Sequence, residues 1–279
     1  MKIYKVLFIV VLFFAYHIKA QPFTLKSVGE KKPFSLEIYY GTKGKGAFVQ
    51  YKGRKGIIPL KIKSYKIDDS QREYCQPDFT SYVWDEIADG KVNGTYYLTE
   101  GLRDVFDVKY IRKSDSKVFK LEFHKDKSEE YDGVNGLFLH HAMISYNTFY
   151  NNLLTIKYSE NDQFKTELPD IDSPNFSRHA TIDDYNFDGH DDISFSIPDA
   201  GMGVYRTFTV FIFDPATKKF KKLKEPDFSK AKCSCFCDLK LDKVKKEVSS
   251  ACRGGARWWK DVYQYKNGNL VWLRSGEAE

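Results

Sequence analysis

Short runs of aromatic and β-branched residues recur along the chain, and Gly, Asn, Asp and Lys interrupt them about every ten residues. Apolar and polar positions alternate within most runs, so one face of each strand can pack while the other meets water. Helical periodicity of comparable length is hard to find. The pattern predicts an all-β, antiparallel protein, with strands in its first half at residues 34–40, 46–51, 57–65, 94–99, 107–111 and 118–123.

Hairpins are predicted in the last third of the chain. A strand at 205–214 and one at 219–223 flank an Asp-Pro-Ala-Thr turn at 214–217. Two further hairpins join 239–241 to 247–250 and 258–265 to 270–274, the last through an Asn-Gly step. Either an antiparallel β sandwich or a propeller-like set of sheets would satisfy this pattern.

The first twenty residues resemble a secretory signal peptide, which would occupy 1–20. Lys2 and Lys5 precede an apolar run at 6–16, and the small residue Ala20 follows it. The run is shorter than the ~20 residues that span a bilayer, and nothing later is longer or more apolar. We therefore expect a periplasmic or secreted protein, cleaved near Ala20 and without a membrane span.

A charged, poorly periodic stretch at 125–132 separates the first set of strands from the second. It predicts an N-terminal β module at 21–128 and a C-terminal β domain at 129–279. Loss of the signal peptide removes three lysines and no acid, so the formal net charge falls from +6 to +3. Because nucleic-acid binding needs a concentrated basic face, we do not expect nucleic acid as a partner.

The segment 184–192 carries oxygen side chains at the positions that a calcium loop requires. Asp184, Asn186, Asp188 and Asp192 stand at loop positions one, three, five and nine, and the carbonyl of His190 stands at seven. Gly189 at position six permits the sharp turn. These residues predict a Ca²⁺ site, and Asp183 and Asp191 are expected to point to solvent rather than to the ion.

The loop is not a complete EF-hand, because Phe195 occupies the twelfth position, where a bidentate Glu is expected. Residues 193–197 read as a strand, so the loop would cap a β element and lack flanking helices, as in the FG-GAP-like repeats of integrin-type propellers. The alternative is an Asp/Asn-rich turn without metal. The spacing of the four oxygen side chains and the glycine favours calcium.

All five cysteines lie beyond the signal peptide, where disulfides can form. Cys237 and Cys252 would face each other if Leu241 pairs with Val248, which predicts a cross-strand disulfide. The odd count leaves at least one thiol unpaired in the monomer, and Cys75 could pair with Cys233 or Cys235. A zinc site is the weaker alternative, because paired CxxC spacing is missing.

No sequence motif marks a catalytic site. His140 and His141 are adjacent, and neighbours on a strand point to opposite faces, so we do not expect a shared site. A nucleophile elbow, a zinc-protease helix and a phosphate-binding loop are all missing from the sequence. We therefore expect a binding protein rather than an enzyme.

The loop after residue 199 is a candidate for partner binding. Its residues are Gly201, Met202, Gly203, Val204, Tyr205 and Arg206. The glycines allow a tight exposed backbone, and Tyr and Arg are types that anchor interfaces. An ordinary hairpin turn whose Tyr covers the sheet edge fits the residues equally well.

The order of these motifs resembles the C-terminal region of calcium-containing periplasmic immunity proteins that protect bacteria from lysozyme-like effectors. That group is similar to the bacterial inhibitors of invertebrate-type lysozyme, and the resemblance covers about residues 175–275. In such inhibitors a Ser-Gly-x-Tyr loop enters the lysozyme cleft. Gly203, Val204 and Tyr205 match the Gly-x-Tyr part, while Met202 replaces Ser, so no Ser hydrogen bond to a catalytic acid is carried over.

The resemblance implies an exported, calcium-stabilised inhibitor or immunity protein whose partner is a lysozyme-like peptidoglycan hydrolase. It gives no account of residues 21–125. The alternative is a structural or carbohydrate-binding surface module, in which the Trp258-Trp259 pair would stack on sugars. A hydrolase with carboxylates that no motif marks is a third reading. Nothing in the sequence predicts the oligomeric state.

Overall fold

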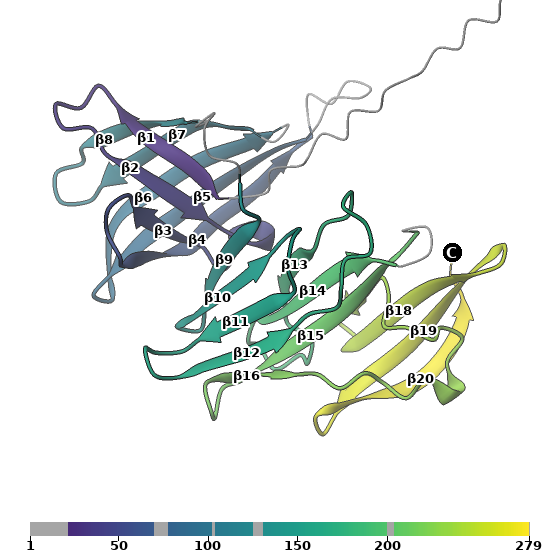
Figure 1. Cartoon of the computed structure of the whole chain (residues 1–279). Coiled ribbons are helices and arrows are strands. Elements are labelled where there is room, and N and C mark those ends of the chain that lie inside the picture. Colours follow the sequence, from purple (N-terminus) through teal and green to yellow (C-terminus); the bar gives the residue numbers. More distant parts are fainter. Residues whose placement is uncertain (1–21, 70–77, 102–103, 125–130, 200–203, 279) are drawn as a thin grey trace, which may run out of the picture.

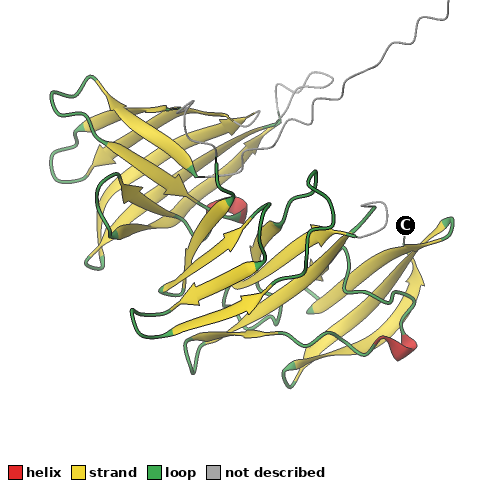
Figure 2. Ribbon diagram, viewed as in Figure 1, coloured by secondary structure: helices red, strands yellow, loops and turns green. Residues whose placement is uncertain are grey.

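The computed structural model describes residues 22–69, 78–101, 104–124, 131–199 and 204–278. Nearly all of its regular structure is antiparallel strand, and the described helical pieces are two 3-10 turns, η1 (Thr42–Gly44) and η2 (Phe228–Lys230) (Figure 2). The all-β class predicted from the alternating pattern is confirmed.

The first eight strands form a closed barrel in which each strand pairs with its neighbours in the sequence. Closure comes from β1 and β8, whose register sets Leu25 opposite Phe123. All six strands predicted in the first half of the chain are strands of this barrel (Figure 1). The strands are β1 (Phe23–Val28), β2 (Ser35–Tyr39), β3 (Phe48–Tyr51), β4 (Ile57–Asp68), β5 (Phe79–Ala88), β6 (Lys91–Gly101), β7 (Asp104–Arg112) and β8 (Val118–Phe123).

Large side chains fill the barrel interior, because every second residue of a strand points inward. On β5 these are Tyr82, Trp84 and Glu86, all less than 9% exposed. Tyr82 and Trp84 stack with ring centroids 5.1 Å apart. The Trp84 indole donates a 2.7 Å hydrogen bond to the carbonyl of Gly44, which lies in the β2–β3 connection.

The β2–β3 connection, residues 41–46, lies between one end of the barrel and the rest of the protein. The Ile182 amide donates to Thr42 Oγ1 (2.7 Å), and the Phe138 amide donates to the Gly46 carbonyl (2.8 Å). Gly41 is needed for this approach, because a Cβ there would lie 2.8 Å from Ile182 Cδ1.

The rest of the chain forms three four-stranded antiparallel meanders, which we call sheets B, C and D (Figure 1). Sheet B contains β9 (Val134–Leu139), β10 (Ala142–Asn147), β11 (Leu153–Lys157) and β12 (Gln163–Glu167). Sheet C contains β13 (His179–Asp183), β14 (Asp192–Pro198), β15 (Arg206–Asp214) and β16 (Lys219–Lys222). Sheet D contains β17 (Lys240–Asp242), β18 (Glu247–Gly254), β19 (Arg257–Lys266) and β20 (Asn269–Glu277).

Sheet C packs between the other two sheets. Phe211 of β15 lies in the apolar core shared with sheet B, whereas its neighbour Val210 lies in the core shared with sheet D. Six consecutive residues of β14, Asp192 to Ile197, are buried as a result. The three sheets thus pack in series, and the closure of the first eight strands into a barrel was not anticipated from the sequence.

The predicted hairpins of the last third are confirmed. Leu241 pairs with Val248, as the sequence indicated. Asn267 and Gly268 have φ of 48° and 83°, the positive pair of a two-residue hairpin turn. The predicted division between residues 128 and 129 falls within 125–130, outside the described residues.

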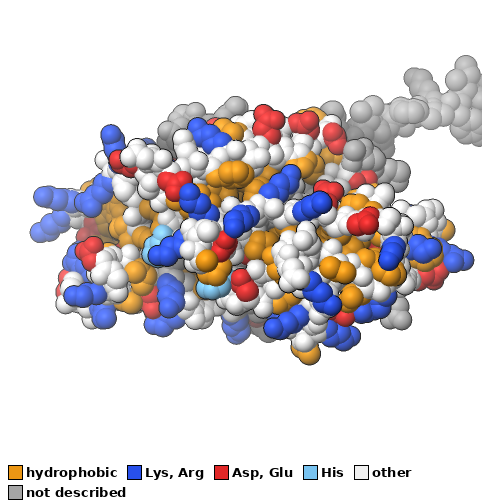
Figure 3. Space-filling view, turned by 90° about the horizontal axis from the view of Figure 1, so that it is seen from below, with side chains coloured by type: hydrophobic (Ala, Val, Ile, Leu, Met, Phe, Trp, Pro, Cys, Tyr) orange, Lys and Arg blue, Asp and Glu red, His pale blue; other side chains and the backbone are white. Residues whose placement is uncertain are grey.

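The surface carries both signs of charge. On the face shown in Figure 3, basic and acidic side chains are interspersed with apolar ones. Within the described part of the chain, no helix is long and apolar enough to cross a membrane.

Candidate calcium loop and partner segment

The predicted calcium loop connects β13 to β14 in the central sheet. Its second residue, Tyr185, is buried in the core between sheets C and D, and the Tyr185 hydroxyl lies 2.6 Å from Ser194 Oγ. Gly189 adopts φ of 91°, the left-handed conformation expected at loop position six. The aromatic residue among the acids thus anchors the loop to the core beneath it.

The oxygen side chains of the loop accept hydrogen bonds from its backbone. Asp184 accepts from the amides of Asp188 (3.1 Å) and Gly189 (2.9 Å). Asn186 Oδ1 accepts from the Asp188 amide (3.1 Å), and Asp188 Oδ1 accepts from the His190 amide (2.8 Å). These bonds curve the loop around its own carboxylates and turn Asp184, Asn186 and Asp188 toward a common interior.

Asp192 differs from the other acids because it is fully buried. Its two oxygens accept from the amides of Tyr185 and Phe213, both at 2.8 Å, and so tie the loop to β15. Burial, together with the charges of Asp188 and Asp184, raises the pKa of Asp192 to about 7. The three carboxylates therefore repel one another, and a cation among them would relieve that repulsion.

The loop also contacts every other part of the molecule. Asp191 forms an ion pair with Lys45 of the barrel, and Asp183 forms one with Lys243 of sheet D (2.7 Å). The carbonyl of Asp191 accepts from His140 Nε2 of sheet B (2.7 Å). Asp183 and Asp191 thus pair with lysines of neighbouring parts instead of pointing only to solvent, and the loop joins the β2–β3 connection as a point of contact between barrel and sheets.

The donor set suits a hard cation. Carboxylate, amide and carbonyl oxygens are the ligands that calcium prefers, and Asp184, Asn186, Asp188, Asp192 and the His190 carbonyl are all of this kind. Among the described residues, no three Asp, Glu, His or Cys side chains converge closely enough to hold a metal ion between them. Calcium at this loop therefore stays a prediction, and coordination would require its side chains to close inward.

The predicted partner segment begins at the other end of β14. Gly201, Met202 and Gly203 lie outside the described residues. Its base is closed by a reciprocal pair, in which the Tyr205 amide donates to Asp199 Oδ1 (3.1 Å) and the Asp199 amide donates to the Tyr205 carbonyl (2.9 Å). Because β14 has seven residues, about 20 Å of strand separates this segment from the calcium loop.

The Arg206 side chain forms its hydrogen bonds within the protein. Its guanidinium donates to Ser196 Oγ (2.9 Å) and to the carbonyls of Ser196 (2.6 Å) and Ser177 (2.7 Å). Burial lowers its pKa from the ordinary value. Among the described residues of this segment, Tyr205 and Val204 are half-buried and remain the candidates for a partner contact.

The predicted Cys237–Cys252 disulfide is wrong. Cys252 is bonded to Cys233, with Cα atoms 5.7 Å apart, and Cys235 is bonded to Cys237. The predicted register holds for Leu241 and Val248, but β17 begins only at Lys240 and the chain before it turns toward β15, where Cys237 bridges Thr207. Cys75 lies outside the described residues.

Although the sequence suggested it, His140 and His141 do not lie within a strand. They form the two-residue turn between β9 and β10, with φ of 48° and 64°.

Of the adjacent pair Trp258 and Trp259, it is Trp259 that faces the interior. Its side chain packs against the buried cysteines, and the Lys232 amine lies over its ring.

No protein-family model matches this chain, and no curated protein matches its sequence.

Proposed function

We propose that this protein is an exported inhibitor or immunity protein that binds a lysozyme-like peptidoglycan hydrolase through residues 201–206. The observation that carries the proposal is the sequence order of a calcium-type loop, a buried strand, a Gly-x-Tyr segment and a second strand. The described structure supports it by giving the Tyr205 segment a closed base at the end of the β14–β15 hairpin. Binding would be stoichiometric, without turnover.

Calcium would support this function indirectly, since about 20 Å of β14 separates the ion from the segment. Asp192 connects the loop to Phe213 of β15, and Arg206 at the opposite end of β15 fastens that strand to Ser196 of β14. Ion binding would hold the β14–β15 pair in one register and thereby keep the base of the partner segment in place.

Inhibition assays test the proposal. The rate of peptidoglycan lysis by lysozymes of the main structural classes, the invertebrate type included, is measured against the molar ratio of added protein. We expect inhibition of at least one enzyme that saturates near one-to-one. Tyr205→Ala should raise the concentration needed by about tenfold or more, because a central aromatic anchor often contributes 2 kcal/mol or more.

Tyr150→Ala is the matched control, because Tyr150 is 69% exposed and lies on the β10–β11 loop of sheet B. This variant should inhibit as the unmodified protein does. Lysis that is unchanged for every enzyme, or reduced equally by both tyrosine variants, would argue against the proposal. Binding to a glycan array without inhibition would instead favour a carbohydrate-binding module that uses Trp258.

A further inference from the structure

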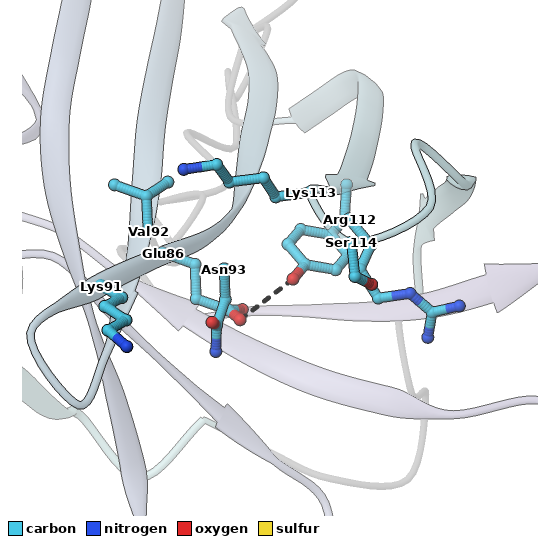
Figure 4. A pocket seen from close by; sticks show the side chains of 8 residues that line it. Glu86, Lys91, Val92, Asn93, Arg112, Lys113 and Ser114 are labelled. Atoms are coloured by element: carbon cyan, nitrogen blue, oxygen red, sulfur yellow. Dashed lines mark hydrogen bonds between the residues drawn. The ribbon is translucent and has the colours of Figure 1, made fainter.

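The barrel has a polar pocket at the end remote from the sheets. Its walls come from the ends of β5 and β7, the start of β6 and the turn after β7, and its volume is about 760 Å³ (Figure 4). The β2–β3 connection lies at the opposite end of the barrel, so this pocket opens away from the calcium loop. Barrel mouths of this size are common places for small-molecule binding. The lining residues are Glu86, Lys91, Val92, Asn93, Tyr110, Arg112, Lys113 and Ser114.

Glu86 lines this pocket as a buried acid, only 4% exposed. Its Oε1 accepts a 3.0 Å hydrogen bond from the Tyr110 hydroxyl, drawn as the dashed line in Figure 4. Its Oε2 is buried, and no described residue gives it a hydrogen bond of standard geometry, although the Tyr96 hydroxyl lies close enough to lower the pKa of Glu86. A buried carboxylate oxygen without a donor is costly, so the site is chemically incomplete as it stands.

The surroundings of Glu86 are built to hold it in place. Gly94 lies between Glu86 and Arg112 in the sheet register, and a Cβ on it would lie 2.4 Å from the Tyr110 ring. The glycine thus lets that ring lie against the strand and direct its hydroxyl to Glu86. Tyr96 and Tyr51, whose hydroxyls are 3.1 Å apart, continue the group of tyrosines beside the acid. Burial raises the pKa of Glu86, while the hydroxyls of Tyr110 and Tyr96 oppose this.

The rim of the pocket carries the opposite charge. Arg112 is held by Asp115 through two bonds, Nε to Oδ1 (2.9 Å) and a terminal nitrogen to Oδ2 (2.6 Å), so its charge is largely balanced. Lys91 and Lys113 also line the pocket and extend from the two turns that flank it (Figure 4). A ligand would therefore meet Glu86 and the Tyr110 ring on the inner wall and two amines at the rim.

We propose that this pocket binds a small zwitterion of the amino-acid type. The ligand's ammonium group would pair with the Glu86 carboxylate, which would turn to present its buried Oε2, and would lie against the ring of Tyr110, because carboxylates and aromatic rings both attract cations. Its carboxylate would face Lys91 and Lys113. The binding site is separate from the segment proposed to inhibit a hydrolase, and it stands whether or not that inhibition occurs.

Calorimetric titration of the full mature protein tests this inference. The probes are glycine, L-alanine and glycylglycine, compared with ethylamine, which lacks the carboxylate, and propionate, which lacks the amine. We expect one-to-one binding of at least one zwitterion, with ethylamine and propionate about tenfold or more weaker. Glu86→Gln and the double variant Lys91→Met/Lys113→Met should each weaken binding about tenfold or more, because each removes a charge-assisted contact.

Glu100→Gln is the matched control. Glu100 also accepts hydrogen bonds from tyrosines, those of Tyr40 (3.0 Å) and Tyr82 (3.3 Å), but it lies near the other end of the barrel. The Glu100→Gln variant should bind the zwitterion with an affinity within about twofold of the unmodified protein, whereas a loss of 1.4 kcal/mol would weaken binding tenfold. No binding of any zwitterion, equal binding of ethylamine or propionate, or unchanged affinity in Glu86→Gln would overturn the inference. If Glu86→Gln fails to fold, the ¹³C carboxyl resonance of Glu86 must move when glycine is added, and a static resonance overturns the inference.

Discussion

His140 donates a 2.7 Å hydrogen bond from Nε2 to the backbone carbonyl of Asp191, next to the last residue of the candidate calcium loop. A carbonyl can only accept, so Nε2 carries the proton. The ring also stacks on Phe213 with centroids 3.7 Å apart. A turn residue of sheet B thus positions the loop of sheet C, although His140 has a positive φ that a side chain of its kind seldom adopts.

Replacing His140 tests this connection. His140→Asn tolerates the positive φ but removes the ring stack and the bond to Asp191, so we expect about 1–2 kcal/mol loss of stability in chemical denaturation. His141→Asn is the control, because His141 shares the turn but is exposed. It should change stability by less than about 0.5 kcal/mol. Equal losses in both variants would mean that the turn alone matters.

Glu86 makes stability depend on pH. Its folded-state pKa is raised above the ordinary value of 4.5, chiefly by burial, so folding penalises the charged form of this side chain. Its contribution is therefore intact below pH 4.5 and is lost as pH rises through the folded pKa. Glu86→Gln should become more stable relative to the unmodified protein as pH increases from 4 to 8.

Melting temperatures across that range provide the measurement. Glu225→Gln, at an exposed position, supplies the baseline. A difference between Glu86→Gln and the unmodified protein that stays constant with pH would contradict the assignment of Glu86 as a buried, destabilising carboxylate.

The cysteine pairing can be mapped directly. Non-reducing digestion and mass spectrometry should yield a peptide pair joined by Cys233 and Cys252, and alkylation without reductant should label one cysteine, Cys75. Because Cys233, Cys235 and Cys237 share one peptide, the second bond, Cys235 to Cys237, should make that linked pair two hydrogens lighter, and fragmentation of the peptide should place Cys252 on Cys233. A peptide pair joined by Cys237 and Cys252 would contradict the structure.

Arg178, which lies just before β13, ties the β12–β13 connection to the β10–β11 connection of sheet B. One terminal nitrogen donates to the carbonyls of Asn147 (2.6 Å) and Asn151 (2.9 Å), and the other donates to Asn152 Oδ1 (2.8 Å) and the Pro169 carbonyl (2.7 Å). The side chain is almost fully buried. Arg178→Met should cost about 3–5 kcal/mol in denaturant unfolding, since four acceptors lose their donors. Arg253→Met, on the exposed end of β18, should cost less than about 0.5 kcal/mol.

Local sequence patterns predicted the strands and hairpins but not how they close. Alternation located six of the eight barrel strands, all but β1 and β5, and Asn267-Gly268 located a turn, because both signals arise within a few residues. Closure depends on pairing β1 with β8, which lie nearly the whole barrel apart in the sequence. The His140-His141 turn was missed because neither residue is a usual choice at positive φ.

The candidate sites were predictable to different degrees. The loop at Asp184–Asp192 was found from spacing, and Gly189 has the conformation that spacing requires. The disulfide error came from extending the β17 register to Cys237, beyond the point where the strand begins. Glu86 had an unused signal, because Tyr82, Trp84 and Glu86 follow the two-residue period of an inward face, and an acid there is unusual.

The central claim is that calcium binds within Asp184–Asp192, and calorimetric titration of the chelator-treated protein with calcium tests it most directly. Asp188→Asn keeps a side-chain oxygen that can accept from the His190 backbone amide but removes one negative charge, so calcium affinity should fall about tenfold or more. Asp191→Asn, which alters the pair with Lys45, should keep its affinity. We predict that the heat of calcium binding vanishes in Asp188→Ala and persists in Asp191→Asn. The account would be contradicted if the unmodified protein takes up no calcium at millimolar concentration, or if Asp188→Ala binds calcium as tightly as the unmodified protein does.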